Sequence, residues 1–241
     1  IVHNGSKLNY VTVTNHAING DFSLDTNADG LADGFSILSS LASKSVVDNT
    51  QIFTSSSQFG GIAQSNFGND TDIYYMSVMV KSNRNNIGFR TQVPLIGEVH
   101  SGSGTFESLS FTSAISSITP NNIRIIDANP SGWTEVQIRG LIVINLTTAF
   151  GVGNEPPKEK CRHILFPNYF TGEKKVIVNS IKITSNEMLT ILTNMTNDSK
   201  TYPATVTIDG YEDYANPPQS VIDAVALFKT TKSVTTVNLG A

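Results

Sequence analysis

Short extended segments separated by polar turns recur along this chain, and 72–82 is the clearest of them. Its side chains alternate between two sets: Tyr74, Met76, Val78 and Val80 in one, and Tyr75, Ser77, Met79 and Lys81 in the other. Strict alternation predicts a strand with one face in a hydrophobic core and the other facing outward. We expect the first set to form the core face.

Similar segments recur at short intervals: 11–14, 35–39, 43–47, 51–55, 60–64, 87–93, 106–112, 123–128, 133–147 and 175–184. Regularly spaced strands with turns rich in Ser, Asn, Asp and Gly indicate a β-sandwich or a barrel. The longest apolar segment, 133–147, is expected to place these residues on one face: Val136, Ile138, Ile142, Ile144 and Leu146. Gly140 interrupts it and predicts a bulge. The last segment, 175–184, is expected to be the final strand of the sandwich.

The sequence changes character after Phe150. A short helix is expected from Pro156 or Pro157 through Ile164, with Asn154 as its cap. Residues 186–241 then suggest two helices and two strands, and 204–210 resembles 235–241 at an offset near 31. One strand-plus-helix unit repeated is typical of a solenoid. We therefore predict a linker at 1–10, a β domain at 11–185 and a small α/β module at 186–241.

Composition narrows the class of protein. Only 15% of the 241 residues are charged, so Ser, Thr and Asn are expected to supply much of the polar surface. This composition favours an extracellular or virion-borne protein. The net charge of −4, with no basic cluster, disfavours nucleic-acid binding. No apolar run is long enough to span a membrane. The chain starts without Met or a signal peptide, so we expect it to begin inside a longer polypeptide.

A calcium-like loop lies early in the chain, around Gly30. The predicted ligand set is Asp25, Asn27, Asp29, Leu31 and Asp33. Calcium takes about 6–8 oxygen ligands, and glycine permits the sharp turn that lets them converge. The twelfth position is Ser36 instead of a bidentate Glu, and no helices flank the loop. The expectation is a structural calcium site within β structure, completed by a ligand from elsewhere; the alternative is an Asx-rich turn without metal.

A sugar-binding surface is predicted on the outward strand faces. Tyr75 is the candidate to stack on a sugar ring, and the planar polar side chains beside it are Arg90, Gln92, Gln137 and Arg139. The alternatives are that these side chains solvate a sheet face or pack against a neighbouring subunit. Trp133, the only tryptophan, is interpreted as a packing residue.

No catalytic set is recognisable. The four histidines form no metal pair at helical spacing, and the chain has neither a Gly-x-Ser-x-Gly elbow nor a phosphate loop. The sequence does not exclude a pair of catalytic carboxylates of the glycosidase type, because only the fold brings such a pair together. Cys161 excludes an internal disulfide and is interpreted as a structural thiol. We expect a protein that is not an enzyme.

Several stretches resemble segments of two known families. Residues 19–22 with Gly34 and Phe35 resemble the first strand of carbohydrate-binding-module jelly rolls, and 74–81 resembles their central strand. Residues 179–183 look like their last strand, with Asn179 and Ser180 where those modules usually carry two acidic residues. Residues 144–156, followed by an aromatic-Gly stop at 169–172, resemble a segment of tail and minor structural proteins of phages and prophages of Gram-positive bacteria.

The resemblance covers roughly residues 11–184. It implies a jelly-roll β-sandwich and a non-catalytic phage tail or baseplate component that binds a glycan of the host cell surface. It also implies other tail proteins as partners and a homo-oligomer. The alternatives are a purely structural tail-assembly protein, or an accessory carbohydrate-binding module of a secreted polysaccharide-degrading enzyme.

Overall fold

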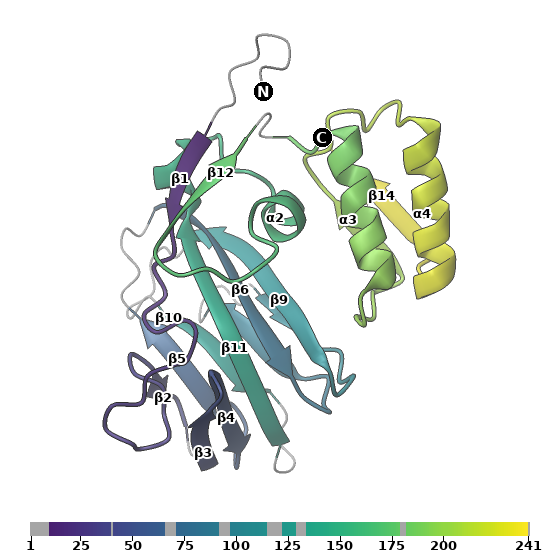
Figure 1. Ribbon diagram of the computed structural model, residues 1–241. Coiled ribbons are helices and arrows are strands. Elements are labelled where there is room, and N and C mark those ends of the chain that lie inside the picture. The colour runs from purple at the N-terminus through teal and green to yellow at the C-terminus, as the bar shows by residue number, and fades with distance from the viewer. Residues whose placement is uncertain are drawn as a thin grey trace.

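The computed structural model describes residues 10–39, 41–65, 71–91, 97–114, 122–128, 134–178 and 182–240. Two five-stranded antiparallel sheets stack as a β-sandwich (Figure 1). The β10 sheet has the order β2 (Ser36–Ile37), β5 (Gly61–Ser65), β10 (Asn122–Asp127), β7 (Ile87–Thr91) and β8 (Gly97–Val99). The β11 sheet has the order β3 (Leu41–Val47), β4 (Thr50–Ser55), β11 (Thr134–Asn145), β6 (Ile73–Lys81) and β9 (Phe106–Ala114).

The core between the sheets follows the alternation of the sequence. On β6, the inward set is fully buried as predicted: Tyr74, Met76, Val78 and Val80. From the opposite sheet, Ile62, Phe89 and Ile125 meet them. Burying each such side chain contributes about 1.5–3 kcal/mol, so this interior is the main source of stability for the sandwich.

The predicted bulge in β11 is present, and it changes which side chains face the core. The register against β6 shifts between Arg139 and Ile142, and Gly140 has a φ of 64°. Before the bulge, Val136 and Ile138 point into the sandwich; after it, Leu141 and Val143 do so instead. The prediction that 136–146 presents one continuous apolar face is therefore wrong. Ile142, Ile144 and Leu146 belong to a different core, because the bulge adds a residue and reverses the alternation.

That second core lies under a third layer on the outer face of the β11 sheet. The layer consists of β1 (Tyr10–Thr14), β12 (Glu173–Ile177), α1 (Leu146–Phe150), α2 (Lys158–Lys160) and the π-helical turn η1 (Cys161–Leu165). It covers Tyr75, Ile142 and Ile144. Cys161 is buried here, and burial raises the pKa of its thiol, as suits a structural cysteine.

Two boundaries in this layer differ from expectation. The 175–184 segment is not a strand of the sandwich, since β12 pairs with β1 in a separate two-stranded sheet. Residues 179–181, including Asn179 and Ser180, lie outside the described residues. The helix begins after Pro157, which occupies the N-cap position, so Asn154 is not the cap. Proline suits this position because its fixed φ is compatible with a helix start.

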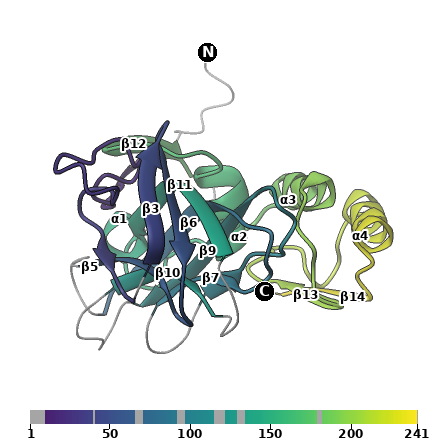
Figure 2. The same cartoon turned by 90° about the horizontal axis from the view of Figure 1, so that it is seen from below.

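The C-terminal unit has α3 (Ser185–Asn197), β13 (Thr205–Ile208), α4 (Gln219–Lys232) and β14 (Thr236–Leu239). Figure 2 shows α3 and α4 on one side of the β13–β14 pair. The two strands are parallel, and Thr205 pairs with Thr236, which matches the offset near 31 seen in the sequence. The unit has its own buried cluster, which includes Met188, Ile191, Val221 and Phe228.

The fold class is confirmed: a mainly β protein with a jelly-roll sandwich and a small α/β appendage. None of the helices in the described ranges is long and apolar enough to cross a membrane.

Candidate functional site

The predicted sugar-binding residues do not share one surface. Arg90 lies on β7 of the β10 sheet, whereas Gln137 and Arg139 lie on β11 of the other sheet. Gln92 and Trp133 lie outside the described residues. The sequence therefore identified outward-facing positions but did not reveal that they belong to opposite sides of the sandwich.

Tyr75 is not available to a sugar. Its side chain points away from the sandwich core, as the alternation predicts, but it is 0% exposed because the third layer covers it. The ring packs against Phe166, with centroids 5.6 Å apart. Burial also raises the pKa of its hydroxyl. The prediction that Tyr75 forms an exposed stacking platform is wrong, because nothing in the strand pattern reveals a covering layer formed by distant residues.

Gln137 and Arg139 lie on the part of the β11 sheet that the third layer leaves open. The Arg139 guanidinium lies 3.9 Å from the ring centroid of Phe106, which is a close cation–π contact. The Gln137 amide donates a hydrogen bond of 2.9 Å to the Glu135 carboxylate. Both polar groups are thus engaged by neighbouring side chains of the same sheet.

A cleft of about 460 Å³ lies on the β10 sheet, and we call it the Arg90 cleft. It is lined by Leu38, Ser39, Gln58, Phe59, Arg90, Arg124 and Ile126. Arg124 of β10 pairs across the strands with Arg90 on one side and Ala63 on the other. Because paired residues on adjacent strands project from the same face, the two guanidinium side chains leave the sheet together.

Phe59 is the aromatic side chain of this cleft, and the sequence predictions missed it. It is 50% exposed and has a φ of 63°, a conformation that bulky residues rarely adopt. Backbone hydrogen bonds hold it there: its N–H donates to the Asp127 carbonyl at 2.7 Å, and the Asp127 N–H donates to the Gly60 carbonyl at 3.0 Å. The signal in the sequence is an aromatic residue directly before the pair Gly60–Gly61 at a strand start.

Two arginines line the cleft. Burial lowers the pKa of Arg90. At Arg124, both burial and repulsion from the Arg90 charge lower the pKa. The Nε and Nη2 atoms of Arg90 are buried and have no hydrogen-bond partner. Among the described residues that line the cleft there is no Asp or Glu. The cleft therefore places two guanidinium side chains beside an exposed aromatic ring.

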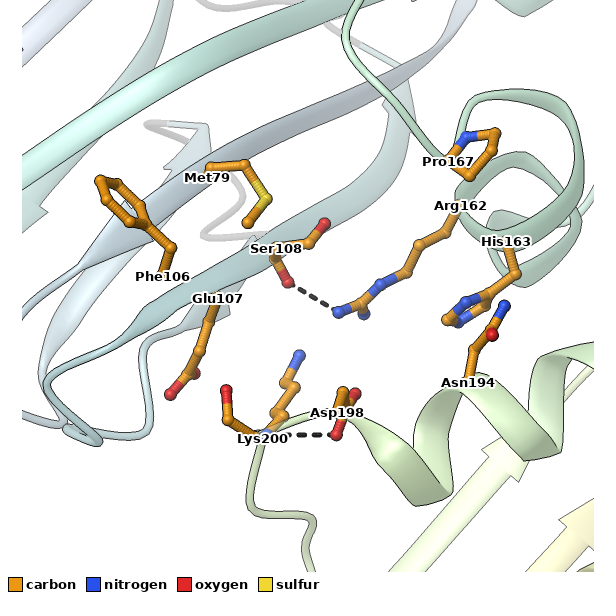
Figure 3. Close-up of a pocket in the computed structure, with 11 residues that line it drawn as sticks. Met79, Phe106, Glu107, Ser108, Arg162, His163, Pro167, Asn194, Asp198 and Lys200 are labelled. Carbon is orange, nitrogen blue, oxygen red and sulfur yellow. Dashed lines mark hydrogen bonds between the residues drawn. The ribbon is translucent and has the colours of Figure 1, made fainter. Parts of the chain in front are cut away.

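A second pocket, of about 370 Å³, lies between the sandwich and the C-terminal unit (Figure 3). Its walls come from Phe106 and Ser108 of β9, Arg162 of η1 and the end of α3 at Asn194. Arg162 reaches across it and donates a 2.7 Å hydrogen bond from Nη2 to the Ser108 carbonyl. We call it the junction pocket.

The charges around the junction pocket pair with one another. The Glu98 carboxylate of β8 forms three ion pairs, with nitrogen–oxygen distances of 2.9 Å to Lys158, 2.7 Å to Lys200 and 3.5 Å to Arg162. Burial alone would raise the pKa of Glu98, but these three cations outweigh it and lower the pKa to about 2. Since Lys158 and Arg162 belong to the third layer and Lys200 follows α3, one carboxylate joins three parts of the protein. The ion pairs of Glu98 beside the junction pocket therefore hold the C-terminal unit against the rest of the protein.

The predicted calcium loop forms a compact turn around Gly30. Asp25 accepts hydrogen bonds from the N–H groups of Asp29 and Gly30 at 3.1 and 2.9 Å. Lys44 forms an ion pair with Asp29 at 3.1 Å. Asp33 is turned toward Thr26, whose N–H and hydroxyl donate to it at 3.1 and 2.9 Å.

The oxygen donors of this turn are of the type that calcium prefers, but the carboxylates are not gathered around one point. The described part of the chain contains no group of three or more His, Cys, Asp or Glu side chains placed to hold a metal ion. For calcium to bind, Lys44 must leave Asp29 and Asp33 must turn inward. Asn27 already lies in the turn, and its side-chain oxygen accepts the Asp29 N–H at 3.2 Å.

No protein-family model matches this chain, and no curated protein sequence matches it. Among solved structures, it is similar to a mutant of a family 29 carbohydrate-binding module, with a TM-score of 0.40 and 14% identity over 58% of this chain and 87% of that one. A related mutant complexed with cellulohexaose gives a TM-score of 0.39 and 15% identity over 49% and 86%. A family 4 module gives a TM-score of 0.38 and 12% identity over 52% and 97%. At these TM-scores, the likeness does not by itself define the function of this chain.

Proposed function

We propose that this protein is a non-catalytic glycan-binding protein and that the Arg90 cleft is its sugar site. The observation that carries the proposal is the exposed Phe59 ring beside Gln58, Arg90 and Arg124 in one cleft of the β10 sheet. Sugar rings have an apolar face that packs on aromatic rings, and hydroxyl groups that bind planar amides and guanidiniums. The Arg90 cleft offers both, and its volume of about 460 Å³ suits a small ligand.

Replacing Phe59 by alanine is expected to weaken glycan binding about tenfold, because a lost aromatic stacking contact costs about 0.5–1.5 kcal/mol beyond its buried area. Isothermal titration calorimetry against oligosaccharides from bacterial cell walls and plant polysaccharides measures this directly. The matched control is Phe106→Ala, which removes an aromatic ring from the β11 sheet and is expected to leave the affinity unchanged. The reverse result would move the sugar site to the Phe106 face.

The biological setting that we propose is attachment to a host cell surface by a phage tail or baseplate, on the virion or outside the cell. It rests on the resemblance of 144–156 to tail proteins, and this segment forms the end of β11, α1 and the turn before α2. Sedimentation with purified Gram-positive cell walls tests it. Glycan binding without any retention by cell walls would favour the accessory-module alternative, and a stable homo-oligomer without glycan binding would favour the tail-assembly alternative.

The calcium site stays a prediction, with its own test. Calcium at a hundredfold excess over its dissociation constant would stabilise the fold by about 2.7 kcal/mol and raise the melting temperature by several degrees. Thermal melts of chelator-treated protein with and without calcium measure the shift. Asp25→Asn is expected to reduce it, and Lys44→Met is expected to enlarge it, because Lys44 competes for Asp29. An equal melting temperature with and without calcium in all three proteins would leave a plain Asx-rich turn.

A further inference from the structure

We infer that the C-terminal unit pairs with the same unit of a second copy of this protein, through the open edge formed by β14 and α4. The pairing is two-fold symmetric, with β14 beside β14 and α4 beside α4. The inference concerns a different surface from the Arg90 cleft, so it does not rest on the proposed glycan function.

The edge of the small sheet is the first argument. β14 pairs with β13 on one side, and in the described part of the chain no strand pairs with its other side. The N–H groups of Thr236 and Gly240 both donate toward the β13 side, at 2.9 Å. Because backbone groups alternate in direction along a strand, the N–H groups of Val237 and Leu239 point toward the open edge. Such an edge is a template for one more strand.

The outer side of α4 is the second argument. Ala224 and Leu227 mark the side that faces α3, because they line a groove of about 70 Å³ together with residues of that helix. The opposite side carries Ile222, Val225 and Ala226, at the i, i+3, i+4 spacing of an apolar stripe. Ile222 is 45% exposed. Figure 1 and Figure 2 both show α4 at the end of the C-terminal unit that lies away from the sandwich.

The interface inside the C-terminal unit indicates what this edge binds. There, β13 pairs with β14 while α3 packs against α4, so one strand-plus-helix unit already binds another of the same kind. The open edge continues this interface by one further position. A second copy of the protein offers a matching surface, because its own β14 and α4 present the same unpaired strand and the same apolar stripe.

The charges of α4 fit a two-fold arrangement. When both helices lie on one side of the shared sheet, the two-fold axis makes the paired strands and the paired helices antiparallel. Asp223 lies three residues before Ala226, and Lys229 lies three residues after it. In an antiparallel pair of helices centred on Ala226, the aspartate of each copy is therefore level with the lysine of the other. One helix and one strand form a small interface, so we expect weak, reversible association.

The first test is sedimentation velocity of the full chain at concentrations from about 1 to 500 µM, the range suited to a small interface. We expect a dimer whose fraction rises with concentration. Ile222→Glu buries a charge within the apolar stripe and is expected to weaken the association at least tenfold. Leu227→Glu is the matched control, the same change on the same helix but on the α3 side, at a side chain that is 60% exposed. It is expected to leave the association unchanged.

A charge exchange tests the antiparallel arrangement. Lys229→Asp places an aspartate level with Asp223 of the other copy and is expected to weaken the association about fivefold. Adding Asp223→Lys to this variant restores opposite charges and is expected to recover the original dissociation constant. A double variant that stays as weak as Lys229→Asp overturns the arrangement.

Amide hydrogen exchange locates the interface without any substitution. The amides of Thr236 and Gly240 bond to the β13 side, so we expect them to exchange slowly at every protein concentration. The amides of Val237 and Leu239 are expected to exchange rapidly in dilute protein and at least tenfold more slowly in concentrated protein, because only the dimer gives them acceptors.

Two outcomes reject the proposed edge. A monomer at every concentration overturns the inference and leaves the edge to a different strand-plus-helix unit. Association that Leu227→Glu weakens as much as Ile222→Glu does, or exchange at Val237 and Leu239 that does not depend on concentration, shows that the copies meet elsewhere. Thermal melts check that the variants fold, and if Ile222→Glu does not, hydrogen exchange of the unsubstituted protein decides. Since no glycan is present, these results are independent of the Phe59→Ala test.

Discussion

Glu98→Gln is expected to lower the free energy of unfolding by about 3–5 kcal/mol, the usual cost of removing one partner from a buried charge cluster. The substitution keeps the shape of the side chain but leaves Lys158, Arg162 and Lys200 without their shared carboxylate. The new amide group also points two hydrogens toward cations. Urea denaturation followed by circular dichroism measures the loss, and limited proteolysis is expected to release the C-terminal unit earlier than in the unsubstituted protein.

The matched control is Glu135→Gln, the same change at an exposed position of β11. It is expected to alter the free energy of unfolding by no more than about 0.5 kcal/mol, as is usual for surface substitutions. Indistinguishable denaturation curves for the two variants would contradict the role of Glu98 as a clamp between the sandwich and the C-terminal unit.

The Glu98 clamp also implies an acid dependence with a defined sign. The three cations lower the pKa of Glu98 from its ordinary value of 4.5 to about 2 in the folded protein. The stabilisation by ionised Glu98 is therefore complete above about pH 4.5 and is lost as the pH falls toward 2. Glu98→Gln has no such titration, so its stability deficit is expected to shrink across this window.

Tyr75→Ala is expected to cost about 3–5 kcal/mol of stability, as for other large aromatic residues removed from a core. The side chain is fully buried between the β11 sheet and the third layer, where it contacts Phe166. Its loss leaves a cavity under η1 and β12. Tyr74, the other aromatic residue of β6, points into the sandwich core and cannot fill this cavity. Urea denaturation measures the loss, and an unchanged midpoint would show that the third layer does not cover this position in solution.

Tyr75→Phe is the matched variant. The Tyr75 hydroxyl is buried near Ser77 and Ser110 but forms no hydrogen bond of good geometry, so removing it is expected to change stability by no more than about 1 kcal/mol. Tyr75→Phe is also expected to bind glycans as the unsubstituted protein does. A selective loss of glycan binding in this variant would restore Tyr75 as a ligand-binding residue.

Local patterns in the sequence predicted much of the fold. The alternation at 72–82 identified the strand β6 and its inward face, because a strand repeats its side-chain direction every two residues. The similarity of 204–210 to 235–241 predicted two strands at an offset near 31, and the structure pairs these strands, β13 and β14, at that offset. Both signals are periodic, so a single chain is enough to read them.

The consequences of irregular positions were harder to predict. Gly140 predicts a bulge, and the structure has one, but Ile142, Ile144 and Leu146 do not share a face with Val136 because a bulge reverses the alternation. The assignment of β12 to the sandwich failed for a different reason. Its pattern is that of a strand, but only the spatial order of the elements decides that β1 is its partner.

At the candidate site, strand alternation in the sequence is enough to predict that Arg90 faces outward. Three features of the site come from the three-dimensional fold: Arg124 lies beside Arg90, Phe59 borders the same cleft, and Tyr75 is covered. The physical reason is the range of the interactions. Strand alternation is set by neighbours along the chain, whereas the pairing of strands, and the layer that covers a face, depend on contacts between residues far apart in sequence.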